Sequence, residues 1–312
     1  MRSQRVLSLI GILASAAMLA TACGGDDNQL DSTDSGNQDK GAVVIGSAGF
    51  TEIQLMAEMY KLLLDKAGYT SSIKVVQNRE VYEPALEKGD IDVVPDYAAT
   101  MVEFLNIKAN GEGAALKASN DKDETVAALN ELGEPLGIKA LDAAEAVDQN
   151  AFVATTEVAA DKGSKLSDWD GESVVLAATE ECPDRPFCQP GLEKTYGLTV
   201  TEVLPLGFGT AQVKEAVTSG KAQLGLTGTT DATLEDLGLV VVEDDKGLQL
   251  ADNLVPVVGK DFADDTELAG ALNALAGELT TEDLAGLNKK VDGERMKEAD
   301  VAKEFLESKG LL

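Results

Sequence analysis

The sequence has no histidine among its 312 residues, only three cysteines, and few aromatic residues, which make up 4% of the chain. Histidine is the commonest general base of hydrolases, and zinc is bound mainly by histidine and cysteine, so these shortages argue against hydrolysis and against a zinc site. The chain also lacks the GxSxG motif of α/β-hydrolases and the GxxxxGK[ST] phosphate loop. We therefore expect no catalytic residue, no metal and no cofactor.

Basic residues are also scarce. The 26 lysines and arginines stand against 55 acidic residues, which gives a formal net charge of −29. Nucleic acid and anionic lipid surfaces repel such a chain, so neither is an expected partner. The acidic residues are scattered along the sequence, which is typical of a solvated surface and does not identify a ligand.

Residues 1–22 have the pattern of an export signal. Arg2 and Arg5 precede an apolar run that is shorter than the roughly 20 residues of a membrane span. Small residues then lead to Cys23, which resembles a bacterial lipoprotein signal with cleavage before Cys23 and lipid on its thiol. An ordinary signal peptide with an incidental cysteine is the alternative. We expect an extracytoplasmic protein anchored by lipid alone to the outer face of the bacterial cytoplasmic membrane.

Residues 23–40 are rich in Asp, Asn, Ser and Gly, and we interpret them as a flexible tether before a folded part that begins near Gly41. The two remaining cysteines, Cys182 and Cys188, are six residues apart. In an oxidising compartment such a pair is expected to close a small disulfide loop, and two reduced core cysteines are the alternative.

Hydrophobic patterns predict two α/β halves. In the first half, three strands alternate with two helices, over residues 42–46, 51–67, 73–76, 81–88 and 91–94. In the second half the same order recurs, over residues 173–177, 191–196, 200–204, 211–219 and 222–226. This order implies parallel strands with right-handed crossovers, and ligands favour the carboxyl ends of such strands.

The rest of the chain predicts a return to the first half. A strand over residues 253–258 follows the second half, and three helices come after it, over residues 265–277, 281–290 and 299–309. Two chain crossings, near residues 145–152 and 248–255, would form a hinge. Thr51 with Gln54 has the pattern of a capping box, and Thr280 or Thr281 is a candidate cap further on.

Several stretches then carry a family resemblance, in the right order from about Val43 to Leu312. They are Gly49-Phe50-Thr51-Glu52, Gly89-Asp90-Ile91-Asp92-Val93-Val94-Pro95-Asp96-Tyr97, Glu181-Cys182-Pro183-Asp184-Arg185-Pro186, Pro190-Gly191-Leu192-Glu193-Lys194-Thr195-Tyr196-Gly197, Thr229-Thr230-Asp231 and Asn253 to Val258. Together they resemble the substrate-binding proteins of the glycine betaine, choline and osmoprotectant ABC importers.

The resemblance implies a type II periplasmic-binding fold, an α/β architecture of two lobes with parallel sheets and two hinge crossings. Lobe 1 would comprise residues 41–148 and 253–312, and lobe 2 residues 149–252. Such a protein closes on one small solute and delivers it to a separate ABC permease with its own ATPase, without chemistry. We expect it to act as a monomer.

The resemblance also implies binding residues. Tyr97 matches a tyrosine of the family's aromatic cage, which holds a quaternary ammonium by cation–π attraction. Phe152, after Asn150, lies where another aromatic ring is expected, and a core strand residue is its alternative. Arg185 matches the arginine that binds a solute carboxylate. Its alternative is to brace the disulfide loop by pairing with Asp184 or Glu181.

Five further candidates lie where predicted strands end or helices begin, which are cleft-facing positions: Thr51, Arg79, Tyr82, Thr230 and Asp231. A helix cap is the alternative for Thr51, and a surface ion pair for Arg79. The expected cage looks short of rings, because residues 226–228 and 248–252 lack the aromatics that family members have there. Either Tyr82 or Phe208 compensates, or the solute is of another class, such as an amino acid or an aromatic compound. A solute sensor is the remaining alternative to a transport protein.

Overall fold

The computed structural model describes residues 40–111 and 113–312. The predicted signal peptide, the lipidated Cys23 and the tether up to residue 39 lie outside the described residues. Within the described ranges, no helix combines the length and the apolar character that a bilayer crossing needs.

The first sheet has five strands in the order β2-β1-β3-β10-β4. These are β1 (Ala42–Ala48), β2 (Thr70–Val76), β3 (Val93–Tyr97), β4 (Lys139–Ala140) and β10 (Leu254–Val258). The helices α1 (Thr51–Ala67) and α2 (Arg79–Lys88) connect the parallel strands β1, β2 and β3. The βαβαβ pattern predicted for the first half is confirmed.

The second sheet repeats this arrangement with the order β7-β6-β8-β5-β9. Its strands are β5 (Asn150–Thr155), β6 (Ser173–Ala178), β7 (Thr199–Pro205), β8 (Leu224–Gly228) and β9 (Leu239–Val242). The helices α6 (Gln189–Tyr196) and α7 (Ala211–Thr218) join β6, β7 and β8, which are parallel. The order of strands and helices that recurs along the sequence therefore corresponds to two similarly ordered sheets.

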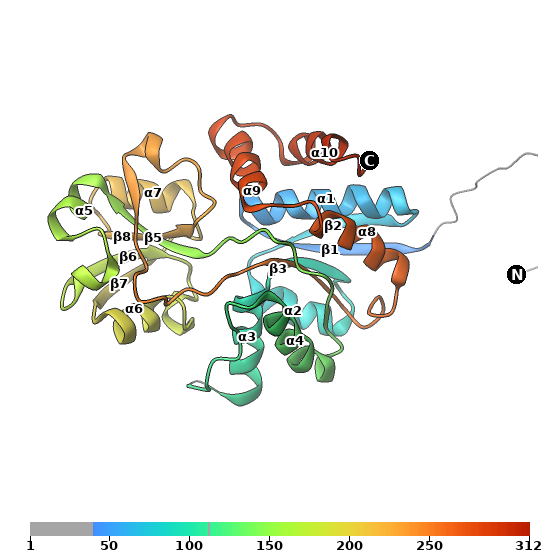
Figure 1. The fold of residues 1–312 in the computed structure, drawn as a ribbon, viewed down its shortest axis with the longest axis horizontal. Helices are drawn as coiled ribbons and strands as arrows, with labels where there is room; N and C mark the ends of the chain where they lie inside the picture. The colour runs from blue at the N-terminus through green and yellow to red at the C-terminus, as the bar shows by residue number, and fades with distance from the viewer. Residues whose placement is uncertain (1–39, 112) are drawn as a thin grey trace, which may run out of the picture. The chain divides into compact units, whose positions relative to one another are not determined.

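Both sheets are mixed, because each adds an antiparallel strand to the parallel strands that the sequence predicts. β10 runs antiparallel to β3 and β4, and β5 runs antiparallel to β8 and β9. Each of these two strands follows a passage between the sheets, between β4 and β5 or between β9 and β10, which Figure 1 shows as two chain segments. A strand that arrives by such a passage is not constrained by a right-handed βαβ crossover.

The remaining helices lie outside the two βαβαβ units. They are α3 (Ala98–Asn110), α4 (Lys122–Gly133), α5 (Thr156–Lys162), α8 (Thr266–Ala276), α9 (Thr281–Asn288) and α10 (Glu298–Ser308). α1 packs against α8, α9 and α10, so the carboxyl-terminal helices cover the first sheet (Figure 1). The first sheet and its helices share one hydrophobic core, and the second sheet has its own around Trp169.

One predicted helix cap is confirmed and one is wrong. Thr280 accepts a hydrogen bond from the amide of Asp283, whose carboxylate accepts the amide of Thr280 in return, which is a capping box. At α1, by contrast, the N-cap is Phe50, and the hydroxyl of Thr51 donates to Asp292 at 2.7 Å. Thr51 is thus drawn to a residue near the end of the chain, a contact that its local sequence does not show.

Candidate functional site

An aromatic-lined cavity of about 720 Å³ lies between elements of the two sheets. The segments that end β1, β3, β6 and β7 line it, so it opens at the carboxyl ends of parallel strands, as the strand order predicts. Six aromatic side chains face it: Phe50, Tyr82, Tyr97, Phe104, Phe187 and Phe208. We call it the aromatic cavity. Six of the chain's thirteen aromatic residues are therefore concentrated in one place.

The rings of the aromatic cavity come from both sheets and contact one another. The Phe50 ring lies 5.3 Å from that of Phe208, centroid to centroid, and 6.3 Å from that of Tyr97, to which it is nearly parallel. Phe50 follows β1, whereas Phe208 follows β7 of the second sheet. Tyr82, Tyr97 and Phe208 are candidates from the sequence, whereas the other three rings were not predicted. Phe50 could have been found, because it directly follows the first predicted strand.

Arg79 and Tyr82 line the aromatic cavity, but their polar groups are already engaged. Both are buried, and both bind the buried carboxylate of Asp96 at the end of β3. The Arg79 guanidinium donates from Nε at 3.1 Å and also forms an ion pair with that carboxylate, while the Tyr82 hydroxyl donates at 2.5 Å. The Arg79 guanidinium further donates to Thr100 at 2.8 Å. The predicted surface ion pair of Arg79 is therefore a buried one.

Arg185 lines the aromatic cavity as predicted, but its partner is not in its own loop. Its guanidinium binds Glu80 of α2 in a bidentate ion pair, with nitrogen–oxygen distances of 2.8 and 3.0 Å, instead of pairing with Asp184 or Glu181. The same guanidinium lies 5.9 Å from the centre of the Phe104 ring. These contacts join the second sheet's disulfide loop to helices of the first sheet.

Glu52, which was not predicted as a site residue, joins the two sheets and binds Tyr97 of the aromatic cavity. Its buried carboxyl group accepts hydrogen bonds from Tyr97 at 2.6 Å, from Thr230 at 2.7 Å and from Asn288 at 2.6 Å. Burial raises the pKa of Glu52, although these three hydrogen bonds act in the opposite direction. Thr230 follows β8, so this carboxyl group connects lobe elements far apart in sequence.

Thr51, Thr230 and Asp231 line a second cavity of about 710 Å³, which we call the polar cavity. It shares Phe50 and Phe208 with the aromatic cavity. Asp231 forms a buried ion pair with Lys214 at 2.7 Å. Burial alone would raise the pKa of Asp231, but the ion pair and its hydrogen bonds hold it below its ordinary value. The three predicted residues thus line the polar cavity and not the aromatic cavity.

The last two candidates, Asn150 and Phe152, lie in different environments. Asn150, the first residue of β5, lines the aromatic cavity. Phe152, two residues on, is 1% exposed and packs in the second sheet's hydrophobic core, and it lines neither cavity. The core alternative therefore describes Phe152, because its position in the strand places it among the residues between sheet and helices.

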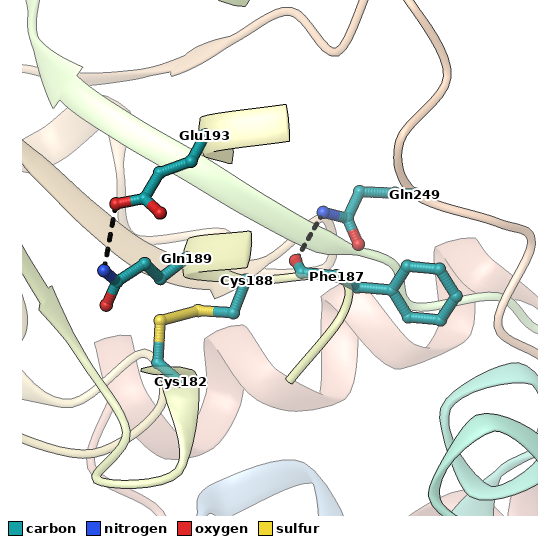
Figure 2. Close-up of a disulfide and its surroundings, with 6 residues drawn as sticks. All are labelled: Cys182, Phe187, Cys188, Gln189, Glu193 and Gln249. Carbon is teal, nitrogen blue, oxygen red and sulfur yellow. Dashed lines mark hydrogen bonds between the residues drawn. A yellow bond between two sulfur atoms is a disulfide. The ribbon is translucent and has the colours of Figure 1, made fainter. Parts of the chain in front are cut away.

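The predicted disulfide between Cys182 and Cys188 is confirmed (Figure 2). It closes the loop that presents Arg185 and Phe187 to the aromatic cavity. The side chain of Gln249 donates to the backbone carbonyl of Phe187 at 2.8 Å, which ties this loop to the segment returning to the first sheet. The disulfide thus supports one wall of the site.

Replacing Cys182 and Cys188 together by alanine should lower the free energy of unfolding by about 2 kcal/mol, because a short closed loop restricts the unfolded chain by roughly that amount. Urea unfolding measures the change. Dithiothreitol should produce the same loss in the wild-type protein and none in the double variant. A wild-type midpoint that does not respond to the reductant would contradict a stabilising disulfide.

Asp252, another buried carboxyl group, lies where the chain returns to the first sheet and lines the aromatic cavity. Its Oδ1 accepts the amide of Ala99 at 2.7 Å. Burial raises its pKa to about 7, although the nearby Arg79 acts to lower it. The folded protein therefore keeps a proton on Asp252 at pH values where the unfolded chain has released it.

This shift predicts a pH-dependent cost that Asp252→Asn removes. Below about pH 4 the carboxyl group is protonated in both states and costs nothing. As pH rises toward 7, only the unfolded chain releases the proton, so the free energy of unfolding falls. The variant should therefore gain on the wild type between pH 4 and pH 8 by up to about 4 kcal/mol. Urea unfolding at several pH values gives this difference. A constant difference between variant and wild type would show that Asp252 ionises normally.

Comparisons with known proteins point to one family. Residues 41–308 match a family model described as the substrate binding domain of ABC-type glycine betaine transport system. The glycine-betaine-binding protein of Pseudomonas aeruginosa is 26% identical over 287 residues, which cover 86% of this chain and 88% of that protein.

Two solved structures are similar in fold. The crystal structure of a glycine betaine/carnitine/choline ABC transporter protein aligns with a TM-score of 0.63 at 22% identity, and covers 86% of this chain and 98% of that one. Lactococcal OpuAC, in its closed conformation with glycine betaine, aligns with a TM-score of 0.58 at 12% identity, and covers 86% and 95%. These likenesses confirm the two-lobed type II periplasmic-binding fold that the sequence predicts.

Proposed function

Because the chain belongs to the family of substrate-binding domains of ABC-type glycine betaine transport systems, we propose that it captures a quaternary-ammonium solute such as glycine betaine or choline in the aromatic cavity. Members of this family are transport proteins. They bind small solutes outside the cytoplasm and work with an ABC permease. Binding and release are the whole task, and the solute leaves unchanged.

The observation that carries this proposal is the concentration of six rings around one cavity. A quaternary ammonium has no hydrogen to donate, so π faces are its best partners, each contributing roughly 0.5–2 kcal/mol when water is excluded. The cage is therefore not short of rings, because Phe50, Phe104 and Phe187 add to those that the sequence named. Tyr82 and Phe208, the two residues suggested to compensate for missing rings, both line the cavity.

We further propose that the solute acts by closing two lobes. The lobes would be residues 41–148 with 253–312, and residues 149–252, hinged at the two passages between the sheets. The contacts of Glu52 with Thr230 and of Glu80 with Arg185 link these two parts. A solute that touches rings of both parts favours the closed form by its additional contacts there. The closed protein would then deliver the solute to the permease.

Lipid attachment at Cys23 would keep this monomer beside its permease. The residue pattern around Cys23 supports this anchor, and the disulfide between Cys182 and Cys188 fits an oxidising compartment. Mass spectrometry of the protein from membranes would detect the lipid, and a water-soluble protein with an unmodified Cys23 would contradict the anchor.

Calorimetric titration of the purified protein with choline, glycine betaine, proline betaine, carnitine and ergothioneine tests the binding proposal. We expect saturable binding of at least one of these quaternary amines. Amino acids without a quaternary nitrogen serve as controls. If every quaternary amine fails to bind and a control amino acid binds, the proposed solute class is wrong.

A further inference from the structure

We propose that the aromatic cavity selects a quaternary-ammonium solute without a carboxylate, such as choline, over a zwitterion such as glycine betaine, and that Glu80 sets this preference by neutralising Arg185. This inference rests on the proposed function, since it assumes that the cavity binds quaternary amines. It concerns the part of the solute beyond the quaternary ammonium, which is a carboxylate in glycine betaine and a hydroxyl in choline.

The positive side chains that line the aromatic cavity are all committed to carboxylates of the protein. They are Arg79, Lys108 and Arg185. Arg79 is paired with Asp96, and Arg185 with Glu80. Lys108 donates to both carboxylate oxygens of Glu83, at 2.8 and 2.9 Å, and also pairs with Glu87. Within the described residues, therefore, no lining cation is left over for a solute carboxylate.

The lining is also rich in acidic groups that lack such a partner. Glu180, Glu181 and Asp184 line the cavity and form no ion pair within residues 40–111 and 113–312. Glu181 instead accepts a hydrogen bond from Asn78 of the other sheet. A solute carboxylate here would meet negative charge, and an anion removed from water without a cationic partner is disfavoured. A solute cation gains from the same charges.

The amino end of α1 offers no substitute for a free cation. The amino end of a helix attracts anions, and Phe50 and Thr51 stand at this one. However, the hydroxyl of Thr51 already binds the carboxylate of Asp292 at 2.7 Å, and Glu52 occupies the first turn. A solute carboxylate placed there would lie beside these two acidic residues.

Glu80 is the residue whose removal should change this balance. Its ion pair with Arg185 is partly exposed, with side-chain exposures of 37% for Glu80 and 27% for Arg185. The pair can therefore open without leaving a fully buried charge unpaired. Glu80→Gln would leave the Arg185 guanidinium with a neutral neighbour and a free charge facing the cavity. Arginine binds carboxylates in a bidentate manner, so a freed Arg185 should receive the carboxylate of glycine betaine.

Calorimetry with choline and with glycine betaine tests the inference. The wild-type protein should bind choline at least tenfold more tightly than glycine betaine. Glu80→Gln should tighten glycine betaine binding at least fivefold and leave choline binding unchanged or weaker. The double variant Glu80→Gln/Arg185→Gln should lose this gain. Glu131→Gln makes the same charge change on α4, away from both cavities, and should change neither affinity.

The outcomes separate this inference from the proposed function. If the wild type binds glycine betaine as tightly as choline, the selection for a cation is overturned while quaternary-amine binding stands. If Glu80→Gln folds with an unchanged melting temperature but leaves glycine betaine binding unchanged, the role of Glu80 is overturned. If neither solute binds, the proposed function itself fails, and this inference fails with it.

Discussion

Replacing Phe50 and Phe208 together by leucine should weaken the binding of a quaternary amine about five- to a thousandfold. Leucine keeps an apolar side chain but removes the π face, and each ring contributes roughly 0.5–2 kcal/mol to a desolvated cation. Phe50 and Phe208 belong to different sheets and contact each other. The variant therefore loses both the ring contacts with the solute and the ring contact that joins the two lobes. Calorimetric titration with choline measures the change.

The control for this prediction is Phe262→Leu. Phe262 packs against Tyr69 and lines neither cavity, so the same substitution there should leave affinity within about twofold of the wild type. A double variant at Phe50 and Phe208 that binds choline like the wild type, with the same melting temperature, would remove the ring cluster from the binding site.

Arg79→Met should produce the largest loss of stability, about 3–5 kcal/mol in the free energy of unfolding. The substitution leaves the carboxylate of Asp96 buried without its cation, and such a broken pair costs far more than a missing surface bridge. The remaining donors to Asp96, the Tyr82 hydroxyl and the Tyr97 amide, do not replace a full charge. Urea unfolding at pH 7 gives the value.

The double variant Arg79→Met/Asp96→Asn supplies the matched comparison. It removes the stranded charge, so it should recover at least half of the stability lost by Arg79→Met alone. If the single and double variants are equally destabilised, the loss is one of packing and the account of the ion pair is wrong.

Sequence patterns located the helices and strands well, because those patterns are local. The helix over residues 51–67 is α1 without any change of bounds, and Thr280 caps α9 as its spacing with Asp283 predicts. The antiparallel direction of β5 and β10 was not predicted, because pairing between strands depends on where a passage between the sheets delivers the chain. No local pattern contains that information.

The site was predicted only in part, for the same reason. The positions of Tyr97, Arg185 and Asn150 at the aromatic cavity agree with the sequence, since each lies at or just after a strand or in the disulfide loop. Arg185 was given the wrong ion-pair partners, because Glu80 lies 105 residues away on another helix. Phe104 lies on a helix and was missed for a similar reason.

We propose that aromatic rings hold the positive charge of the solute, and an uncharged analogue tests this most directly. In 3,3-dimethylbutan-1-ol a quaternary carbon replaces the nitrogen of choline, so shape is kept and charge is lost. Several rings acting on a cation predict that choline binds at least tenfold more tightly than this alcohol in calorimetric titration. Equal affinities for choline and the alcohol would contradict the claim.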